Sequence, residues 1–178
     1  GCERLVAMMD EFGLADLERL ADFVIERSRL AMLQRIREIR PGRYRHQMRI
    51  DGYDHEIDLV CTLEVSADGI EVDFDGTSPI SNRGINVPLT YTRAYASFGV
   101  RCVVGPEVPN NAGSLGTIHV TAPRGSILNA QPPSAVSARH AVGQMLPDVV
   151  LGCLRMALET PVPAEGASCL WNPVLMGG

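Results

Sequence analysis

The sequence has 178 residues and a formal net charge of −5, and it is 46% hydrophobic and 21% charged, which is typical of one globular domain. It contains no basic run, which argues against nucleic acid or an anionic membrane as a partner, and no apolar run reaches the ~20 residues of a membrane span. We expect no secretory signal, because charged residues interrupt the first ten positions. All 16 basic residues are Arg, so a phosphate-loop lysine, a Schiff-base lysine and a lysine general base are excluded within this chain.

The cysteines indicate a reducing compartment. Five of them stand at positions 2, 61, 102, 153 and 169, and no two form a C-x-x-C pair. An odd number without such a motif favours buried, reduced thiols in a cytosolic protein over a disulfide framework. A catalytic pair of cysteine and histidine stays open, although no spacing in the sequence marks one.

The first forty residues predict helices. Residues 2–12 place apolar side chains on one face, and Gly13 is a natural helix stop. Residues 16–39 predict a long amphipathic helix that ends at Pro41-Gly42, with most of its arginines outside the apolar stripe. Such a basic face is typical of a solvated surface or of a contact with an acidic partner, and phosphate binding is the alternative. We therefore expect a helical segment over residues 1–40.

After this segment the apolar period changes from 3.6 to 2. Three predicted strands share the alternation and cover residues 43–50, 57–65 and 70–75. Short turns with Gly join them, so the pattern predicts an antiparallel meander with one buried face. In the third strand Ile70, Val72 and Phe74 should be buried, whereas Glu71 and Asp73 should face water or arginine.

The rest of the chain alternates regular elements with long loops rich in Gly, Asn and Pro. A helix is expected at 89–104, a short strand at 117–122 and a last helix at 137–158, which Pro147 kinks or splits. The loops cover residues 76–88, 105–116 and 123–136. We predict an α+β fold, a small antiparallel β-meander packed with several helices and long ordered loops, in a core region of residues 41–178. The apolar tail around Leu170 and Trp171 is expected to pack against a further surface.

One short stretch suggests a phosphatase. Residues 73–77 follow the Asp-x-Asp-Gly-Thr pattern of haloacid-dehalogenase-type phosphatases, in which the first Asp is the nucleophile and the second the general acid. That family's strand is parallel and buried on both faces, whereas Glu71 and Asp73 alternate with apolar residues here. The later acidic pair for magnesium and the downstream lysine are also missing. A solvated strand face that runs into a turn is the simpler interpretation.

The remaining chemistry-bearing residues form no strong motif. The sequence has no Gly-rich phosphate cradle, no H-E-x-x-H and no G-x-S-x-G, and its four histidines are scattered. His46 lies on the apolar side of its strand, which is typical of a packed histidine. Arg139 and His140 open the last helix, where backbone N–H groups and the helix dipole favour anions. A carboxylate or phosphate could bind there, and a structural role is the alternative.

An ordered series of weak motifs is more specific than any one of them. The series comprises residues 73–79, 84–88, 108–110 with Gly113, 122–129, 133–136 and 138–140. In this order the motifs resemble the B subunit of the hydantoinase/oxoprolinase family. Residues 41–44, 51–52, 147–150 and the final Gly177-Gly178 fit the same family, so the resemblance covers essentially all 178 residues.

The resemblance implies an ATP-dependent enzyme that hydrolyses cyclic amides such as hydantoins and 5-oxoproline, with ketone carboxylation as the alternative reaction. It implies a hetero-oligomer in which an A-type subunit or domain binds ATP and the B-type part completes the reaction. The family's B part is much longer, with a metal-binding segment upstream and a Gly-rich segment downstream. We therefore expect an internal piece of a larger subunit, inactive in isolation, that binds neither the ATP nor the divalent metal implied for the whole enzyme. A non-catalytic assembly module is the other interpretation.

The loops predict where a substrate would bind. Loops of this length are uncommon unless they are functional or packed together, so we expect all three to converge on one side of the domain near Arg139. Neutral hydrogen-bonding groups would suit an imide or amide ring, and Arg139 would anchor a carboxylate. The candidate substrate-binding residues are Asp75, Thr77, Ser78, Asn86, Asn110, Arg139 and His140. Turn formation is the simpler role for the asparagines, and no catalytic residue or metal ligand is assigned.

Overall fold

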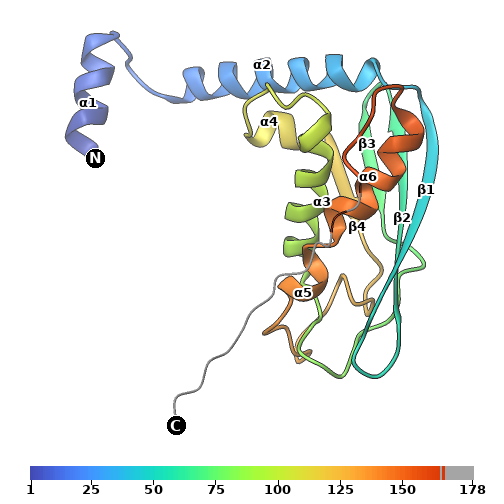
Figure 1. Ribbon diagram of the computed structural model, residues 1–178. Helices are drawn as coiled ribbons and strands as arrows, with labels where there is room; N and C mark the ends of the chain where they lie inside the picture. The colour runs from blue at the N-terminus through green and yellow to red at the C-terminus, as the bar shows by residue number, and fades with distance from the viewer. Residues whose placement is uncertain (165, 167–178) are drawn as a thin grey trace.

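A computed structural model describes residues 1–164 and 166, and it contains a four-stranded sheet with helices on one face (Figure 1). The strands are β1 (Gly42–Ile50), β2 (Ile57–Ser66), β3 (Gly69–Asp73) and β4 (Ile118–Thr121), in that spatial order. The first three form the predicted antiparallel meander, and β4 pairs in parallel with β3. The α+β prediction is therefore confirmed. The predicted packing of Leu170 and Trp171 lies outside the described residues.

The alternation predicted for β3 is confirmed. Ile70, Val72 and Phe74 are at most 1% exposed, whereas Glu71 is exposed. Asp73 is partly buried and accepts a hydrogen bond from the Thr121 hydroxyl at 3.2 Å. The three apolar side chains belong to the core, because α3 and α6 cover this face of the sheet.

The expectation of one buried face is wrong for the middle of β2. Val60 and Thr62 point away from the helices, yet they are only 3% and 6% exposed. Val60 is covered by the chain after β3, which returns over the outer face of the sheet at Gly76. The two faces of β2 are thus covered by different parts of the chain.

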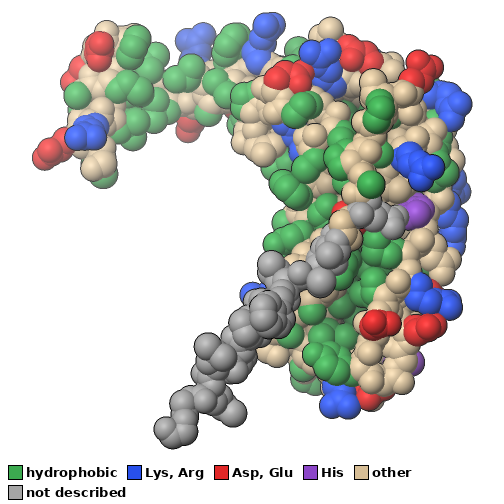
Figure 2. Space-filling model, in the orientation of Figure 1, with side chains coloured by type: hydrophobic (Ala, Val, Ile, Leu, Met, Phe, Trp, Pro, Cys, Tyr) green, Lys and Arg blue, Asp and Glu red, His purple; other side chains and the backbone are tan. Residues whose placement is uncertain are grey.

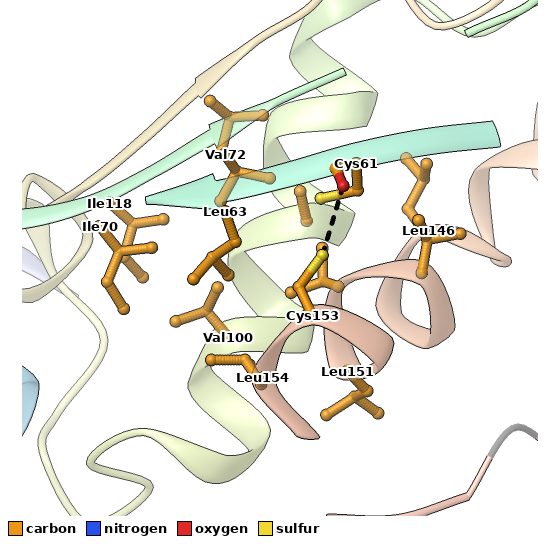
Figure 3. Packing of buried hydrophobic residues seen from close by; sticks show 14 of the residues in the cluster. Cys61, Leu63, Ile70, Val72, Val100, Ile118, Leu146, Leu151, Cys153 and Leu154 are labelled. Carbon is orange, nitrogen blue, oxygen red and sulfur yellow. Dashed lines mark hydrogen bonds between the residues drawn. The ribbon is translucent and has the colours of Figure 1, made fainter. Parts of the chain in front are cut away.

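Two helices cover the apolar face of the sheet, α3 (Leu89–Val103) and α6 (Leu146–Ala157). Figure 3 shows Leu63 of the sheet near Val100 of α3 and Leu154 of α6. The expected helix over 137–158 is split into a single turn, α5 (His140–Gly143), and α6. Pro147 lies in the first turn of α6, where a missing N–H leaves no helical hydrogen bond unmade. This is one of the two outcomes expected for Pro147.

A pair of buried thiols joins α6 to the sheet. Cys61 and Cys153 are both 0% exposed, and the Cys153 Sγ lies 3.4 Å from the Cys61 carbonyl oxygen (Figure 3). The neighbouring Cys153 thiol and burial together raise the pKa of the Cys61 thiol well above its usual range. Their burial agrees with the prediction, whereas Cys2 and Cys102 are exposed, so the prediction of buried thiols is wrong for those two.

The N-terminal helices are α1 (Cys2–Glu11) and α2 (Glu18–Arg37), close to the predicted boundaries. The second half of α2 contributes Met32, Leu33 and Ile36 to the core, whereas its first half and α1 project from the body (Figure 1). The division at residue 40 stays a prediction. None of the helices described here is long and apolar enough to cross a membrane.

A short helix was not foreseen within the expected loop 105–116. It is α4 (Ala112–Leu115), which packs on α2. Asn111 caps it, because its side chain accepts hydrogen bonds from the amides of Gly113 and Ser114. The Asn111 amide also donates to the Ser28 hydroxyl of α2 at 2.8 Å. These bonds fix α4 and the loop before it against α2.

Candidate functional site

Two of the three predicted loops interlock at the end of the domain near α5. The amide of Ile127 donates to the Ser78 carbonyl at 2.9 Å, and the amide of Ile80 donates to the Gly125 carbonyl at 3.0 Å. Val87 donates to Ile127 at 2.7 Å. Loops 76–88 and 123–136 therefore form one continuous hydrogen-bonded layer, as expected for loops that pack together.

Thr77 and Ser78 extend the sheet by means of their side chains. Because β3 ends at Asp73, the edge of β2 before Thr62 has no strand partner on that side. There the Thr77 hydroxyl accepts from the Val60 amide at 3.0 Å and donates to the Val60 carbonyl at 3.1 Å. The Ser78 hydroxyl accepts from the Asp58 amide at 2.9 Å. Thr77, the last residue of the phosphatase-like stretch, and Ser78 after it thus satisfy the backbone of β2.

Asn86 ties the two loops together from inside. It is 0% exposed, and its Oδ1 accepts from the Ser81 amide at 2.7 Å. Its Nδ2 lies 2.9 Å from the carbonyl oxygens of Ser81, Arg83 and Ala135, the last of which belongs to the second loop. The hydrogen-bonding groups of the amide are therefore engaged within the domain.

Asp75 and Arg139 are exposed, but they lie on opposite sides of the sheet. The turn at Asp75-Gly76 covers the outer face, since a Cβ at Gly76 would lie 3.4 Å from the Arg45 guanidinium and 3.6 Å from the Val60 side chain. Arg139 lies on the helical side, with its guanidinium carbon 5.7 Å from the centre of the Tyr91 ring. These two residues therefore do not share one cleft.

An aromatic stack accompanies Arg139. The rings of Tyr91 and Tyr95, one turn apart on α3, are nearly parallel with centres 4.5 Å apart. Burial and a hydrogen bond with Tyr95 raise the pKa of Tyr91. Gly143 of α5 makes room for the stack, because a Cβ there would lie 2.4 Å from the Tyr91 ring. Arg139, partly buried His140 and the two tyrosines thus gather at the join of α3 and α5, and the sequence analysis did not identify the tyrosines.

The third loop lies at the other end of α3, so the prediction that all three loops converge is wrong. Its Asn110 accepts a hydrogen bond at 3.0 Å from Arg101, in the last turns of α3. Fifteen helical residues, about 22 Å at 1.5 Å per residue, separate this end of α3 from the Asn86 loop. The buried Arg101 also donates to the carbonyls of Val104, Gly105 and Val108, which shape the loop.

A hollow of about 580 Å³ lies between the β1–β2 hairpin and α5. Its apolar side comprises Ile50, Ile85, Val142 and Met145. Its charged lining residues are Arg49 and Asp51. Tyr53, which also lines it, lies under the guanidinium of Arg83, and Arg83 pairs with Asp54 at 2.9 Å. This pairing lowers the pKa of the Asp54 carboxyl. An apolar floor with a polar rim suits a small, weakly polar ring.

A second hollow, of about 610 Å³, is lined by an imidazole, a carboxylate and a guanidinium. It lies between β1 and α6 and is lined by His46, Asp148 and Arg155, with Val162 and Pro163 at its edge. An imidazole and a carboxylate here are groups that can transfer protons. Gly152 leaves room for the histidine ring, because a Cβ at this position would lie 2.1 Å from the His46 ring. The sequence analysis recognised His46 only as a packed residue and did not identify Asp148.

Within residues 1–164, no group of three or more His, Cys, Asp or Glu side chains is arranged to hold a metal ion. A hydrogen bond from Arg49 lowers the pKa of the Asp58 carboxyl. The candidate substrate-binding roles of Asp75, Asn110, Arg139 and His140 stay predictions, whereas Thr77, Ser78 and Asn86 have clear structural roles.

Residues 1–178 match the family model described as Hydantoinase B/oxoprolinase. The chain is 25% identical to the putative B subunit of a D-/L-hydantoinase from Pseudomonas sp. (strain NS671), over 92% of its own length but only 30% of that protein. An ATP-dependent caprolactamase from Pseudomonas jessenii has the same fold, with a TM-score of 0.78 and 20% identity over 88% of this chain and 28% of the caprolactamase chain. A nucleotide-free acetone carboxylase aligns with a TM-score of 0.67 and 17% identity, over 73% of this chain and 19% of that one.

Proposed function

The chain belongs to the hydantoinase B/oxoprolinase family, and from this membership we propose that it forms part of the B-type subunit of an ATP-dependent enzyme that hydrolyses cyclic amides. The observation that carries the proposal is the family match over all 178 residues. The chain spans less than a third of the hydantoinase subunit that it resembles. The activity proposed here is therefore that of a larger assembly to which this chain contributes one part.

The partner in this proposal is an ATP-binding A-type subunit or domain in the cytoplasm. The hydantoinase relative is itself one subunit of an enzyme, which supports a partner subunit. The caprolactamase that shares the fold is ATP-dependent, which supports dependence on ATP. ATP and a divalent metal would bind elsewhere in the assembly.

We assign this chain a supporting role at the substrate site, with the hollow beside α5 as the contact surface. Its apolar floor suits the carbon skeleton of a small lactam or imide ring. Arg139, exposed at the start of α5, would attract a substrate carboxylate. Asn86 and Thr77 would act through the loop layer that they hold together, because their hydrogen-bonding groups are already engaged.

Two alternatives are tied to specific observations. Ketone carboxylation is supported by the likeness of the fold to acetone carboxylase. A non-catalytic assembly module is supported by the placement of Asp75, Asn110 and Arg139 at three separate positions around the domain. Both alternatives are compatible with the fold described above.

The deciding experiment uses the complete B-type subunit with its A-type partner and ATP. Candidate substrates are hydantoin, 5-oxoproline, caprolactam and, separately, acetone with bicarbonate. We expect ADP release coupled to ring opening of at least one cyclic amide. ADP release with acetone and bicarbonate alone would instead support carboxylation. Full activity of variants that fill the hollow, such as Val142→Phe and Ile85→Phe, would support the assembly-module alternative.

A further inference from the structure

The projecting N-terminal helices carry an apolar surface that nothing in the described residues covers. Helix α1 has no buried residue, and Phe12, Phe23 and Val24 are 68%, 62% and 43% exposed. Figure 2 shows hydrophobic side chains on α1, along the adjoining part of α2 and on the concave side of the body below it. Single exposed apolar residues are ordinary, but a contiguous group of this kind marks an interaction site.

This surface continues from α2 to α3. Phe23 and Val24 line a hollow of about 590 Å³ whose other side is formed by Val108 and Pro109. The latter two residues also line a neighbouring hollow of about 370 Å³ with Phe98 of α3, which is 59% exposed. We call the surface formed by Phe23, Val24, Phe98, Val108 and Pro109 the Phe23–Phe98 surface.

The Phe23–Phe98 surface is preformed. The loop that carries Val108 and Pro109 is fixed to α3 by Arg101 and to α2 by the bond between Asn111 and Ser28. Gly113 allows close contact with α2, because a Cβ there would lie only 1.9 Å from the Ile25 carbonyl oxygen. A partner that binds here therefore meets a rigid surface and need not order it.

The surface is mainly apolar, with charged side chains at the edge of its larger hollow. Two of them, Arg35 and Glu107, pair with each other at 2.6 Å, and the third, Arg27, is exposed. Permanent interfaces are more apolar than transient ones. In addition, ten residues are too few for a stable isolated helix, so α1 needs a packing partner.

We propose that the Phe23–Phe98 surface and α1 are covered by the remainder of the same B-type polypeptide. The relatives supply the reason for this occupant: this chain covers 30% of the hydantoinase subunit and 28% of the caprolactamase chain. More than half of a polypeptide of that kind must therefore pack somewhere, and this rigid apolar surface is the place that the domain offers. The inference rests on family membership and does not depend on the reaction proposed above.

Photo-crosslinking in the complete polypeptide tests the occupant directly. Benzoylphenylalanine would replace Phe23 or Phe98 in separate variants, with Tyr53, 72% exposed beside the other hollow, as the control position. We expect crosslinks within one polypeptide from positions 23 and 98, which leave the mass unchanged and join these positions to peptides outside the 178 residues of this chain. A doubled mass would identify a second copy of the polypeptide as the occupant. A mass increase that differs from the mass of one polypeptide would identify a different subunit. Either result, or no crosslink, would overturn the proposal.

Hydrogen exchange provides a second readout that does not rely on crosslinking. Phe23→Asp and Phe98→Asp change exposed side chains of this domain, so they should disturb only what covers them. We expect the amides of α1 to exchange at least about tenfold faster in these variants, because their packing partner is displaced. Tyr53→Asp is the matched control and should leave α1 unchanged. Amides in α1 that exchange freely in the unaltered polypeptide would contradict the proposal.

Discussion

The Thr77 hydroxyl makes both hydrogen bonds that a neighbouring strand would make with Val60, accepting from its amide at 3.0 Å and donating to its carbonyl at 3.1 Å. Thr77 is 9% exposed and Val60 3% exposed, so water has little access to either partner. The Thr of the Asp-x-Asp-Gly-Thr stretch thus completes the edge of β2 where β3 ends. Its resemblance to a phosphatase motif is local and does not extend to the strand that carries it.

Replacing this hydroxyl should be costly. Thr77→Val keeps the shape of the side chain but leaves a buried N–H and a buried C=O of Val60 without partners. We expect a loss of about 2–4 kcal/mol in the free energy of unfolding, measured by urea denaturation, because each unsatisfied buried group costs about 1–3 kcal/mol. Thr77→Ser, which keeps the hydroxyl, is the control and should lose much less. A loss below about 1 kcal/mol for Thr77→Val would contradict the role assigned to the hydroxyl.

Phe74 tests the burial pattern of β3. It is 0% exposed in the core between the sheet and the helices, so Phe74→Ala should destabilise the protein by about 3–5 kcal/mol. The loss can be measured as a lower midpoint of urea unfolding at constant slope. Tyr53→Ala, at a residue that is 72% exposed, should cost less than about 1 kcal/mol. A similarly small loss for Phe74→Ala would contradict the packing.

Gly113 tests the contact between α2 and α4. An added Cβ would lie 1.9 Å from the Ile25 carbonyl oxygen and 2.8 Å from its carbonyl carbon, so the two helices must move apart in Gly113→Ala. We expect a loss of about 1–3 kcal/mol from this overpacking, read from thermal or urea unfolding. The neighbouring residue provides the control, and Ala112→Ser should have little effect. An unchanged stability for Gly113→Ala would mean that the two helices are not held together as described.

The fold was largely predictable because its signals are local. Alternation in residues 70–74 and the turn signals between strands follow from the chain itself, and so does the break at Pro147. The prediction of the site was wrong where the deciding contacts join residues that are distant in sequence. Nothing near Asn110 in the sequence indicates that Arg101 holds its side chain at the far end of α3. Likewise, the asparagine pattern shows Asn86 in a loop, but not that its amide reaches Ala135, 49 residues away.

The tyrosine stack was foreseeable in one respect only. Tyr91 and Tyr95 are four residues apart on a predicted helix, so their proximity was foreseeable. Their stacking beside Arg139 was not, because it depends on Gly143 and on the break that places α5 against α3. The glycines at positions 113, 143 and 152 each allow another group to approach closely, and the glycine is the sign of this contact in the sequence. Which residue makes each contact follows only from the tertiary structure.

Arg139 tests the proposed substrate site in the complete enzyme. Its guanidinium is exposed beside Tyr91, and its own hydrogen bond to the Val136 carbonyl, at 3.2 Å, uses one of five N–H groups. If it anchors a substrate carboxylate, Arg139→Ala should raise KM about tenfold or more while kcat changes much less, since a charge-assisted bond lost in ground and transition state alike weakens binding uniformly. Arg139→Lys should recover part of the loss. The control is Arg43→Ala, at an exposed arginine on the outer face of β1. A fall in kcat at constant KM would assign Arg139 to the chemical step, and unchanged kinetics would remove it from the site.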